Sequence, residues 1–515
     1  MRKRLVSLLF AGIMACSVIG SGVTTFAAEN DSHINLALFT YIEGMDPATD
    51  WCGWNLTRCG VGETLVTVNE NMEIVGQLAD EWEQVDDTTY RFHIRQGVKF
   101  SNGTELTPEI VKDSIQRSID NNSRGGDLKI ANIEVDGENV VFTTDGAYSA
   151  FVSQLTEPMT VIVDTTADTS NYDTMPICTG PYAVSEYVSE EKIELVANEN
   201  YWDGEVPLDK VTLKCVDDQT TRSMALQTGE IDIAYNLKTE NLVEFEGNDN
   251  YDIQELQSLR STYAFMNQNE DHALSDKALR QALLRGLDKE TYCNTLLEGG
   301  ATAGKAPVPP TLDFGFDDLK DENSYDPDSA KKILDEAGYK DVDGDGFVET
   351  PDGDPLVLDF VIYTSRAELG VYAQAAQASL KEIGINVNLN TVSYETLLDM
   401  RDSGQYDLLI WNVLVANTGD PENYLRENWY SSSANNTTGY NNPEVDKLLD
   451  ELAQTFDEDK RKDLIIDIQQ DIMDDAATVF FGYETTYLFS NKKVTGVKMY
   501  PMDYYWLTKD ITLAE

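Results

Sequence analysis

Three histidines, His33, His93 and His272, are the only imidazoles in this chain. None stands in the His-Glu-x-x-His spacing of a zinc protease or beside an obvious serine or cysteine nucleophile. His93 alternates with Arg91 and Arg95, as residues on the polar face of a strand do. The abundant carboxylates will include close pairs by number alone, so no pair can be assigned to acid–base chemistry. The sequence therefore gives little support to catalysis.

A run of aspartates could bind calcium. Asp341, Asp343 and Asp345 stand at positions 1, 3 and 5 of a loop, where that ion takes oxygen ligands. Gly346 at position 6 permits the tight turn, and Asp352 falls at position 12. Helix-loop-helix calcium sites have a longer glutamate at that last position, and here a helix is followed by a strand. A structural calcium site and an empty acidic turn fit the pattern equally well.

Periodicity and capping residues predict the elements that must position such groups. We expect helices over residues 54–65, 108–120, 220–228, 276–287, 289–297, 328–337, 369–383, 445–456 and 460–473. We expect strands over residues 31–39, 210–216, 356–363, 385–389 and 479–488, and a hairpin over 133–144. Strands alternate with helices in the second half of the chain, which favours a mixed or parallel sheet.

The N-terminus has the features of a secretory signal. Arg2, Lys3 and Arg4 precede an apolar run that ends near small residues at Ala27 and Ala28. We predict a signal peptide over residues 1–27. Cys16 also lies in an imperfect lipoprotein box, and a lipid anchor there is the alternative to plain cleavage. On either interpretation the mature protein works outside the cytoplasm.

Length and charge limit the number of domains and the classes of function that the chain can have. With 515 residues, the chain is long enough for about three domains. The formal net charge of −53 disfavours binding to nucleic acid or to anionic lipid. It could steer a cationic ligand inward, although an acidic and soluble surface explains it equally simply.

The pattern of residues 179–234 indicates one continuous module. It begins with the turn Thr179-Gly180-Pro181-Tyr182 and continues through exposed strands, a helix that Gly229 ends, and a strand that starts near Ile231. This stretch resembles the family 5 extracellular solute-binding proteins, the receptors of ABC importers for oligopeptides, dipeptides and nickel complexes. Cys178 stands where that family usually has glycine. Further matches lie at residues 78–83, 90–103, 279–283, 325–327, 337–339 and 419–421.

The resemblance implies an α/β, two-lobed fold like that of periplasmic binding proteins, with mixed sheets, a hinge and an extra subdomain in the N-terminal lobe. The first lobe would comprise residues 28–266 and 486–515, with the subdomain at about 76–172. The second would comprise residues 267–485. No catalysis and no cofactor are implied. The expected partners are a peptide ligand and the permease subunits of an importer with their ATPase, and the receptor is expected to be a monomer.

The resemblance also nominates ligand-binding residues. In dipeptide and oligopeptide receptors an aspartate grips the ligand's α-amino group, and Asn417 stands at that position here. Asp420 could compensate for the missing charge, although a turn or helix-cap role suits it better. Arg366 resembles the arginine that holds the ligand carboxylate, and a surface role competes with that interpretation. Further cleft candidates, each of which could instead pack in a core, are Trp411, Trp429, Trp51, Trp54 and Arg58.

The leading hypothesis for the ligand is a di- or oligopeptide. A nickel or other metal-chelate receptor of the same fold is the alternative, but the contact residues of that branch are not kept. Asp127 replaces an aromatic residue, and no histidine follows His272. A histidine-dependent nickel site is therefore not expected. A secreted hydrolase or adhesin is the alternative from another class, and it would need a nucleophile, a metal or a carboxylate pair in the cleft.

Overall fold

The computed structural model of the protein describes residues 32–38, 44–363 and 366–514. The predicted signal peptide and Cys16 lie outside the described residues, and both stay predictions. No helix within the described ranges combines the length and the apolar character that crossing a bilayer requires.

One mixed sheet of eleven strands forms the frame of the protein. Its order is β15 (Asn386–Val392), β14 (Val357–Tyr363), β16 (Leu408–Leu414), β12 (Tyr251–Met266), β17 (Thr478–Asn491), β11 (Ile233–Leu237), β1 (His33–Leu38), β10 (Lys210–Cys215), β9 (Lys192–Ala197) and β8 (Tyr182–Val188), with β13 (Ala301–Ala303) on β17. β1 is parallel to β10 and β11, and β14 is parallel to β15 and β16. The other pairings are antiparallel. The mixed sheet is as predicted.

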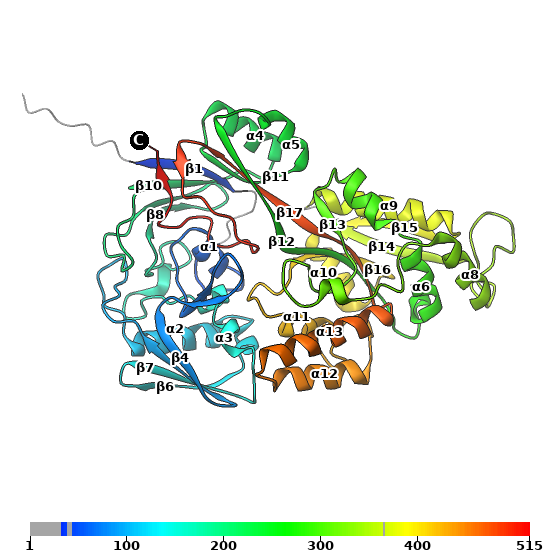
Figure 1. Cartoon of the computed structure of the whole chain (residues 1–515), viewed down its shortest axis with the longest axis horizontal. Coiled ribbons are helices and arrows are strands. Elements are labelled where there is room, and N and C mark those ends of the chain that lie inside the picture. The colour runs from blue at the N-terminus through cyan, green and yellow to red at the C-terminus, as the bar shows by residue number, and fades with distance from the viewer. Residues whose placement is uncertain (1–31, 39–43, 364–365, 515) are drawn as a thin grey trace, which may run out of the picture. The chain divides into compact units, whose positions relative to one another are not determined.

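The long strands β12 and β17 carry this sheet from one half to the other. The start of β12 pairs with the end of β17, which also holds β11, whereas the end of β12 pairs with β16. The register of β12 on β17 shifts between Gln257 and Ser261, which is the mark of a β-bulge. Figure 1 shows the two strands side by side between the β1 half and the β14 half. The predicted lobe boundaries fall at these strands; the exact bounds stay a prediction, and we use "first lobe" and "second lobe" for those ranges.

Most predicted helices form close to their expected bounds. Observed are α2 (Pro108–Asn121), α4 (Gln219–Thr228), α5 (Thr239–Phe245), α6 (Lys277–Arg285), α8 (Pro327–Ala337), α9 (Ala367–Glu382), α10 (Tyr394–Ser403), α11 (Glu422–Trp429), α12 (Pro443–Ala453) and α13 (Glu458–Asp474). Thr107 caps α2, because its side chain accepts from the Ile110 amide at 3.4 Å. Gly338 ends α8 with a φ of 95°, a conformation that glycine adopts without strain.

Two predicted helices are wrong in length. The helix expected over residues 54–65 is only α1 (Gly53–Arg58), because Gly60 turns the chain with a φ of 62°. From there the backbone pairs with the turn of the 179–234 module: the Tyr182 amide donates to the Gly60 carbonyl at 3.0 Å. The helix expected over 289–297 is a short α7 (Lys289–Thr291), followed by a π-helical turn (Tyr292–Leu296).

A second sheet of four strands accompanies α2 in the first lobe. Its order is β4 (Ala79–Asp86), β5 (Thr89–Ile94), β7 (Asn139–Thr144) and β6 (Ile130–Asp136), so the predicted hairpin is confirmed. Phe92, Phe142 and Phe151, the last in α3 (Phe151–Gln154), are buried in one cluster beside it. The remaining small elements are β2 (Val66–Val68) with β3 (Ile74–Gly76), and β18 (Val494–Thr495) with β19 (Thr512–Leu513).

Gly180, in the Thr-Gly-Pro-Tyr turn, should resist substitution. A Cβ there would lie 2.6 Å from the carbonyl oxygens of Gly60 and Val61, which are backbone atoms that cannot move aside cheaply. We expect Gly180→Ala to lower the free energy of unfolding by roughly 1–3 kcal/mol. Urea denaturation followed by tryptophan fluorescence measures this. Gly126→Ala is the control, because a Cβ there meets nothing within 4 Å; equal stability of the two variants would contradict the steric argument.

Candidate functional site

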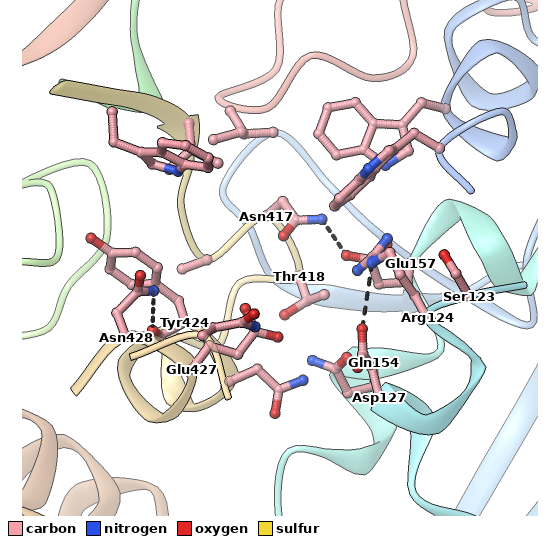
Figure 2. A pocket seen from close by; sticks show the side chains of 18 of the residues that line it. Ser123, Arg124, Asp127, Gln154, Glu157, Asn417, Thr418, Tyr424, Glu427 and Asn428 are labelled. Atoms are coloured by element: carbon pink, nitrogen blue, oxygen red, sulfur yellow. Dashed lines mark hydrogen bonds and ion pairs between the residues drawn. The ribbon is translucent and has the colours of Figure 1, made fainter. Parts of the chain in front are cut away.

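A cavity of about 570 Å³ lies between residues of the first lobe and residues of the second. The first lobe contributes Trp51, Trp54, Ser123, Arg124, Asp127, Gln154 and Glu157. The second contributes side chains from β12, α10, β16, the loop after β16, and α11, among them Tyr263, Tyr394, Arg401, Trp411, Asn417, Asp420, Tyr424 and Glu427. Figure 2 shows how side chains from both sides meet in this space.

Asn417 lies in the loop between β16 and α11 and faces Glu157 across the cavity. Its Nδ2 donates to Glu157 Oε1 at 2.7 Å and to the Tyr504 hydroxyl at 2.7 Å. The loop bends sharply, since Ala416 and Gly419 have φ angles of 49° and 84°. The neutral amide at position 417 is therefore joined to a carboxylate from the other lobe.

Aromatic rings form much of the remaining wall. Trp51 and Trp54 meet edge to face at 5.3 Å between ring centroids, and the Arg124 guanidinium lies 3.8 Å over the Trp51 ring. In the second lobe the Arg401 guanidinium lies 5.2 Å from the Trp411 ring. The indole Nε1 of Trp54 is buried without a hydrogen-bond partner in the described part of the chain. The cavity thus offers apolar faces together with an indole donor that has no protein acceptor.

The charged groups of the cavity are mostly acidic. Arg124 is shared by two carboxylates, with Nη1 3.4 Å from Glu157 Oε2 and Nε 3.4 Å from Asp127 Oδ2. Burial raises the pKa of Glu427 to about 7; the charges of Asp127 and Glu157 also raise it, and those of Arg124 and Lys129 oppose the shift. The arrangement favours a ligand that brings positive charge.

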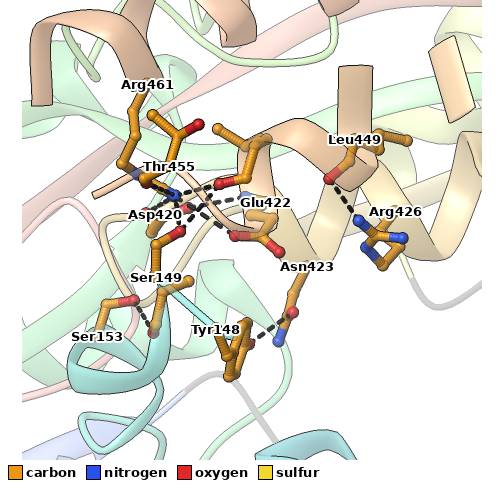
Figure 3. Close-up of polar contacts among 12 residues, drawn as sticks. Tyr148, Ser149, Ser153, Asp420, Glu422, Asn423, Arg426, Leu449, Thr455 and Arg461 are labelled. Carbon is orange, nitrogen blue, oxygen red and sulfur yellow. Dashed lines mark hydrogen bonds and ion pairs between the residues drawn. The ribbon is translucent and has the colours of Figure 1, made fainter. Parts of the chain in front are cut away.

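Asp420 stands at the edge of the cavity in a structural network. It accepts from the Glu422 amide at 2.9 Å, at the start of α11, and from Arg461 Nη2 (Figure 3). Burial raises the pKa of Glu422 to about 7, and the charge of Asp420 adds to the shift. Both contacts agree with a turn or helix-start role for Asp420.

The same network joins the lobes. Arg461 Nη1 donates to the Ser149 hydroxyl, and the Ser149 amide donates to the Ala453 carbonyl at 2.9 Å. Beside it, the Tyr148 hydroxyl donates to Asn423 Oδ1 at 2.7 Å (Figure 3). We call Tyr148, Ser149 and their partners Asn423, Ala453 and Arg461 the closure contacts. They hold residues 148–149 of the first lobe against the helices of the second.

Of the ligand-binding residues predicted from sequence, Asn417, Asp420, Trp411 and Trp54 line the cavity, as does Trp51. The other three are not among its lining residues. Arg366 Nη1 lies 3.5 Å from Glu368 and 3.6 Å from Glu484. The buried Trp429 donates from Nε1 to the Thr478 hydroxyl at 3.2 Å. Arg58 lies behind Trp54, with its guanidinium 5.3 Å from that ring.

No histidine lines the cavity, although all three histidines lie in the described residues. His33 contacts Thr212 at 2.9 Å, His93 contacts Asp80 at 2.6 Å, and His272 contacts Asp407 at 3.1 Å. A metal ion in the cavity would therefore find no imidazole from this protein in this arrangement.

The aspartate loop brings three carboxylates together away from the cavity. Asp341, Asp343 and Asp345 can place oxygen atoms within 4.8 Å of one another, and all three are exposed. Asp352 is not part of this group. Asp341 accepts from the amides of Gly344 and Gly346. Calcium binding by this loop stays a prediction.

Arg124, Glu157, Arg401 and Glu427 line the cavity, and sequence reasoning did not find them. Glu157 and Asn417 are far apart in sequence, and only the folded chain joins them. Glu427 had a local signal. It follows Tyr424 by three residues and Asn423 by four, which places it on the same face of α11 as these two lining residues. That face follows directly on the loop that carries Asn417.

Several known proteins are similar to this chain over most of its length. Nickel-binding protein NikA of Staphylococcus aureus is 25% identical over 513 residues, covering 99% of both chains. Heme-binding protein A of Haemophilus influenzae is 28% identical over 465 residues, covering 84% of this chain and 83% of that one. The crystal structure of the oligopeptide-binding protein AppA of Bacillus subtilis with a nonapeptide has a TM-score of 0.78 at 23% identity, covering 94% and 99% of the chains. That last likeness shows the two-lobed fold.

The sequence model for "Bacterial extracellular solute-binding proteins, family 5 Middle" matches residues 73–436, which is more than half of the chain. The relatives are described as binding proteins for different solutes, and none of those descriptions names an enzyme. The sequence resemblance, the two-lobed fold and the cavity between the lobes thus have one explanation: the protein belongs to the family 5 extracellular solute-binding proteins, the receptors of ABC importers, and is not an enzyme.

Proposed function

We propose that this receptor binds short peptides, di- or oligopeptides with a free α-amino group, in the cavity and delivers them to a membrane permease. The observation that carries the proposal is the pairing of Asn417 with Glu157. Asn417 replaces the aspartate that peptide receptors of this family use for the α-ammonium, and Glu157 Oε1 lies 2.7 Å from the Asn417 amide nitrogen. The Glu157 carboxylate thus lies beside Asn417, where it can accept a charge-assisted hydrogen bond from the α-ammonium of the ligand.

The ligand's other groups also find complements. Arg401 lines the cavity and contacts the exposed Asp402 at 2.8 Å; its guanidinium presents several donors in a plane, so it could meet a peptide carboxylate as well. Arg366 was the sequence candidate for that task, but it is engaged with Glu368 and Glu484. Trp51, Trp54 and Trp411 supply apolar faces for side chains. The unpartnered Trp54 Nε1 could donate to a peptide oxygen.

A metal chelate is the second candidate ligand, because the similar NikA of Staphylococcus aureus is a nickel-binding protein. The cavity has aromatic walls that could cover a chelate. It lacks histidine, so the solute itself would have to supply the imidazole or other soft ligands to the metal.

The proposed cycle requires no covalent chemistry. Solute would select or complete the closed arrangement, with the pair β12 and β17 as the hinge and the closure contacts holding the lobes together. The closed receptor, working as a monomer outside the cytoplasm after removal of residues 1–27, would be recognised by the permease with its ATPase.

The first test compares Ala-Ala with N-acetyl-Ala-Ala by isothermal titration calorimetry. Acetylation removes the ammonium, so we expect affinity to fall by about ten- to a hundredfold, as for loss of a hydrogen bond to a charged group. Glu157→Gln should weaken Ala-Ala by a similar factor and leave the acetylated peptide unchanged.

Glu382→Gln serves as the control, since Glu382 is an exposed helical glutamate outside the cavity. Longer peptides and a nickel–histidine complex complete the panel. If the complex binds and no peptide does, the metal-chelate candidate replaces the peptide proposal.

The second test asks which arginine meets the carboxylate. We expect Arg401→Met to weaken Ala-Ala by about tenfold more than Ala-Ala-amide, because only the free acid loses a charged partner. Arg366→Met should affect both ligands equally, with its main effect on thermal stability. A selective loss in Arg366→Met, measured by the same titrations, would return the carboxylate contact to Arg366.

A further inference from the structure

Glu427 presents a carboxylate to the cavity without a partner. It stands on α11 and lines the space from the second lobe (Figure 2). Among the described residues, no hydrogen bond or ion pair reaches its carboxylate oxygens; only its backbone carbonyl accepts, from Ser433. Removing a charged carboxylate from water without placing a cation beside it is unfavourable. Burial is accordingly the main cause of the raised pKa of Glu427.

The protein's own cations near Glu427 are already engaged. Arg124 bridges Asp127 and Glu157, and Lys129 Nζ lies 4.1 Å over the Tyr148 ring. Three more arginines of this region have acidic partners: Arg461 pairs with Asp420, Arg426 lies 3.1 Å from Asp450, and Arg401 lies 2.8 Å from Asp402. The positive charge that would complement Glu427 is therefore not supplied by these residues.

Asp127 faces the same space from the first lobe. It lies in a short 3-10 turn (Gly125–Leu128), and its charge is the largest electrostatic influence on Glu427. The Arg124 guanidinium pairs with Asp127 and with Glu157, both of the first lobe, and Glu427 has no ion pair with it. A cation between Asp127 and Glu427 would neutralise this excess and would contact both lobes at once.

We infer that Glu427, with Asp127 opposite, forms a subsite for a cationic side chain of the solute, so that the receptor prefers peptides with a lysine or an arginine. This inference rests on the proposed peptide function and deepens it. The α-ammonium lies at Glu157 and Asn417, and the second positive charge lies at Glu427. The position is reached only when both lobes surround the ligand, so it contributes to selectivity in the closed state.

The test uses isosteric dipeptides that differ in one charge. Ala-Lys and Lys-Ala are compared with Ala-norleucine and norleucine-Ala by calorimetry on the purified protein, so that the position of the basic residue is not assumed. We expect a preference of about tenfold or more for a lysine peptide, as for one charge-assisted contact. Glu427→Gln should remove most of the preference. Glu382→Gln, an exposed helical glutamate elsewhere in the second lobe, should retain it.

The outcomes separate the two proposals. If all four peptides bind equally to the unaltered protein, or if Glu427→Gln keeps the preference, the subsite is wrong and the peptide function stands. If no peptide binds, both are wrong. The comparison of lysine with norleucine on the unaltered protein needs no variant, so it decides the matter even if Glu427→Gln does not fold.

Acidification gives an independent prediction. Glu427, whose pKa is about 7, must lose its proton to bind a cation, so acid conditions oppose binding. Between about pH 7 and about pH 5.5 lysine and α-amino groups stay protonated, and affinity for the lysine peptide should fall by roughly tenfold. Other charged groups face the same region: Arg124, Asp127, Lys129, Glu157 and Glu422. Subtracting the pH dependence of affinity in Glu427→Gln from that of the unaltered protein therefore isolates the contribution of Glu427. An identical pH profile in that variant would overturn the subsite.

Discussion

The pairing of β12 with β17 is the contact on which the rest of the structure depends. Each strand contributes one end to the strands around β11 and the other end to the strands around β16 or β13. The two lobes therefore share one continuous sheet. The register shift between Gln257 and Ser261 interrupts this ladder where the strands pass from one lobe to the other. Because a bulge increases local twist and leaves backbone groups less regularly bonded, it is the natural place for the sheet to bend.

A sheet that bends leaves much of the contact between the lobes to side chains, and these include polar pairs beside apolar residues such as Met72 and Trp54, which pack against the second-lobe core. The closure contacts and the pair Asn417 and Glu157 are hydrogen bonds, which act only at short range. Such contacts exchange readily with water, so each contributes little net free energy when the lobes separate. An apolar interface of the same size would hold the lobes shut without solute. The hydrogen bonds between the lobes are thus consistent with a receptor that must open.

The sequence was sufficient for features that depend on neighbouring residues. The helices α2, α8 and α13 follow from their caps and apolar spacing, whereas Asn417 is nominated through the family resemblance. The length of α1 could not be predicted, because Gly60 turns the chain to meet Tyr182, which is distant in sequence. Arg124 and Glu157 were missed for the same reason: the fold and the approach of the lobes bring them into the cavity, and no local pattern records this.

The C-terminal segment supports residues that line the site. Tyr504 accepts from Asn417 and packs edge to face on Trp54 at 5.2 Å, and the Asp503 carboxylate binds Arg260 of β12. The site and the strand β12 of the hinge therefore both contact residues that lie hundreds of positions after Trp54 in the sequence. A chain synthesised only as far as residue 503 lacks the contacts that Tyr504 makes with Asn417 and Trp54. The order of synthesis thus leaves Asn417 and Trp54 without one of their partners until Tyr504 has been added.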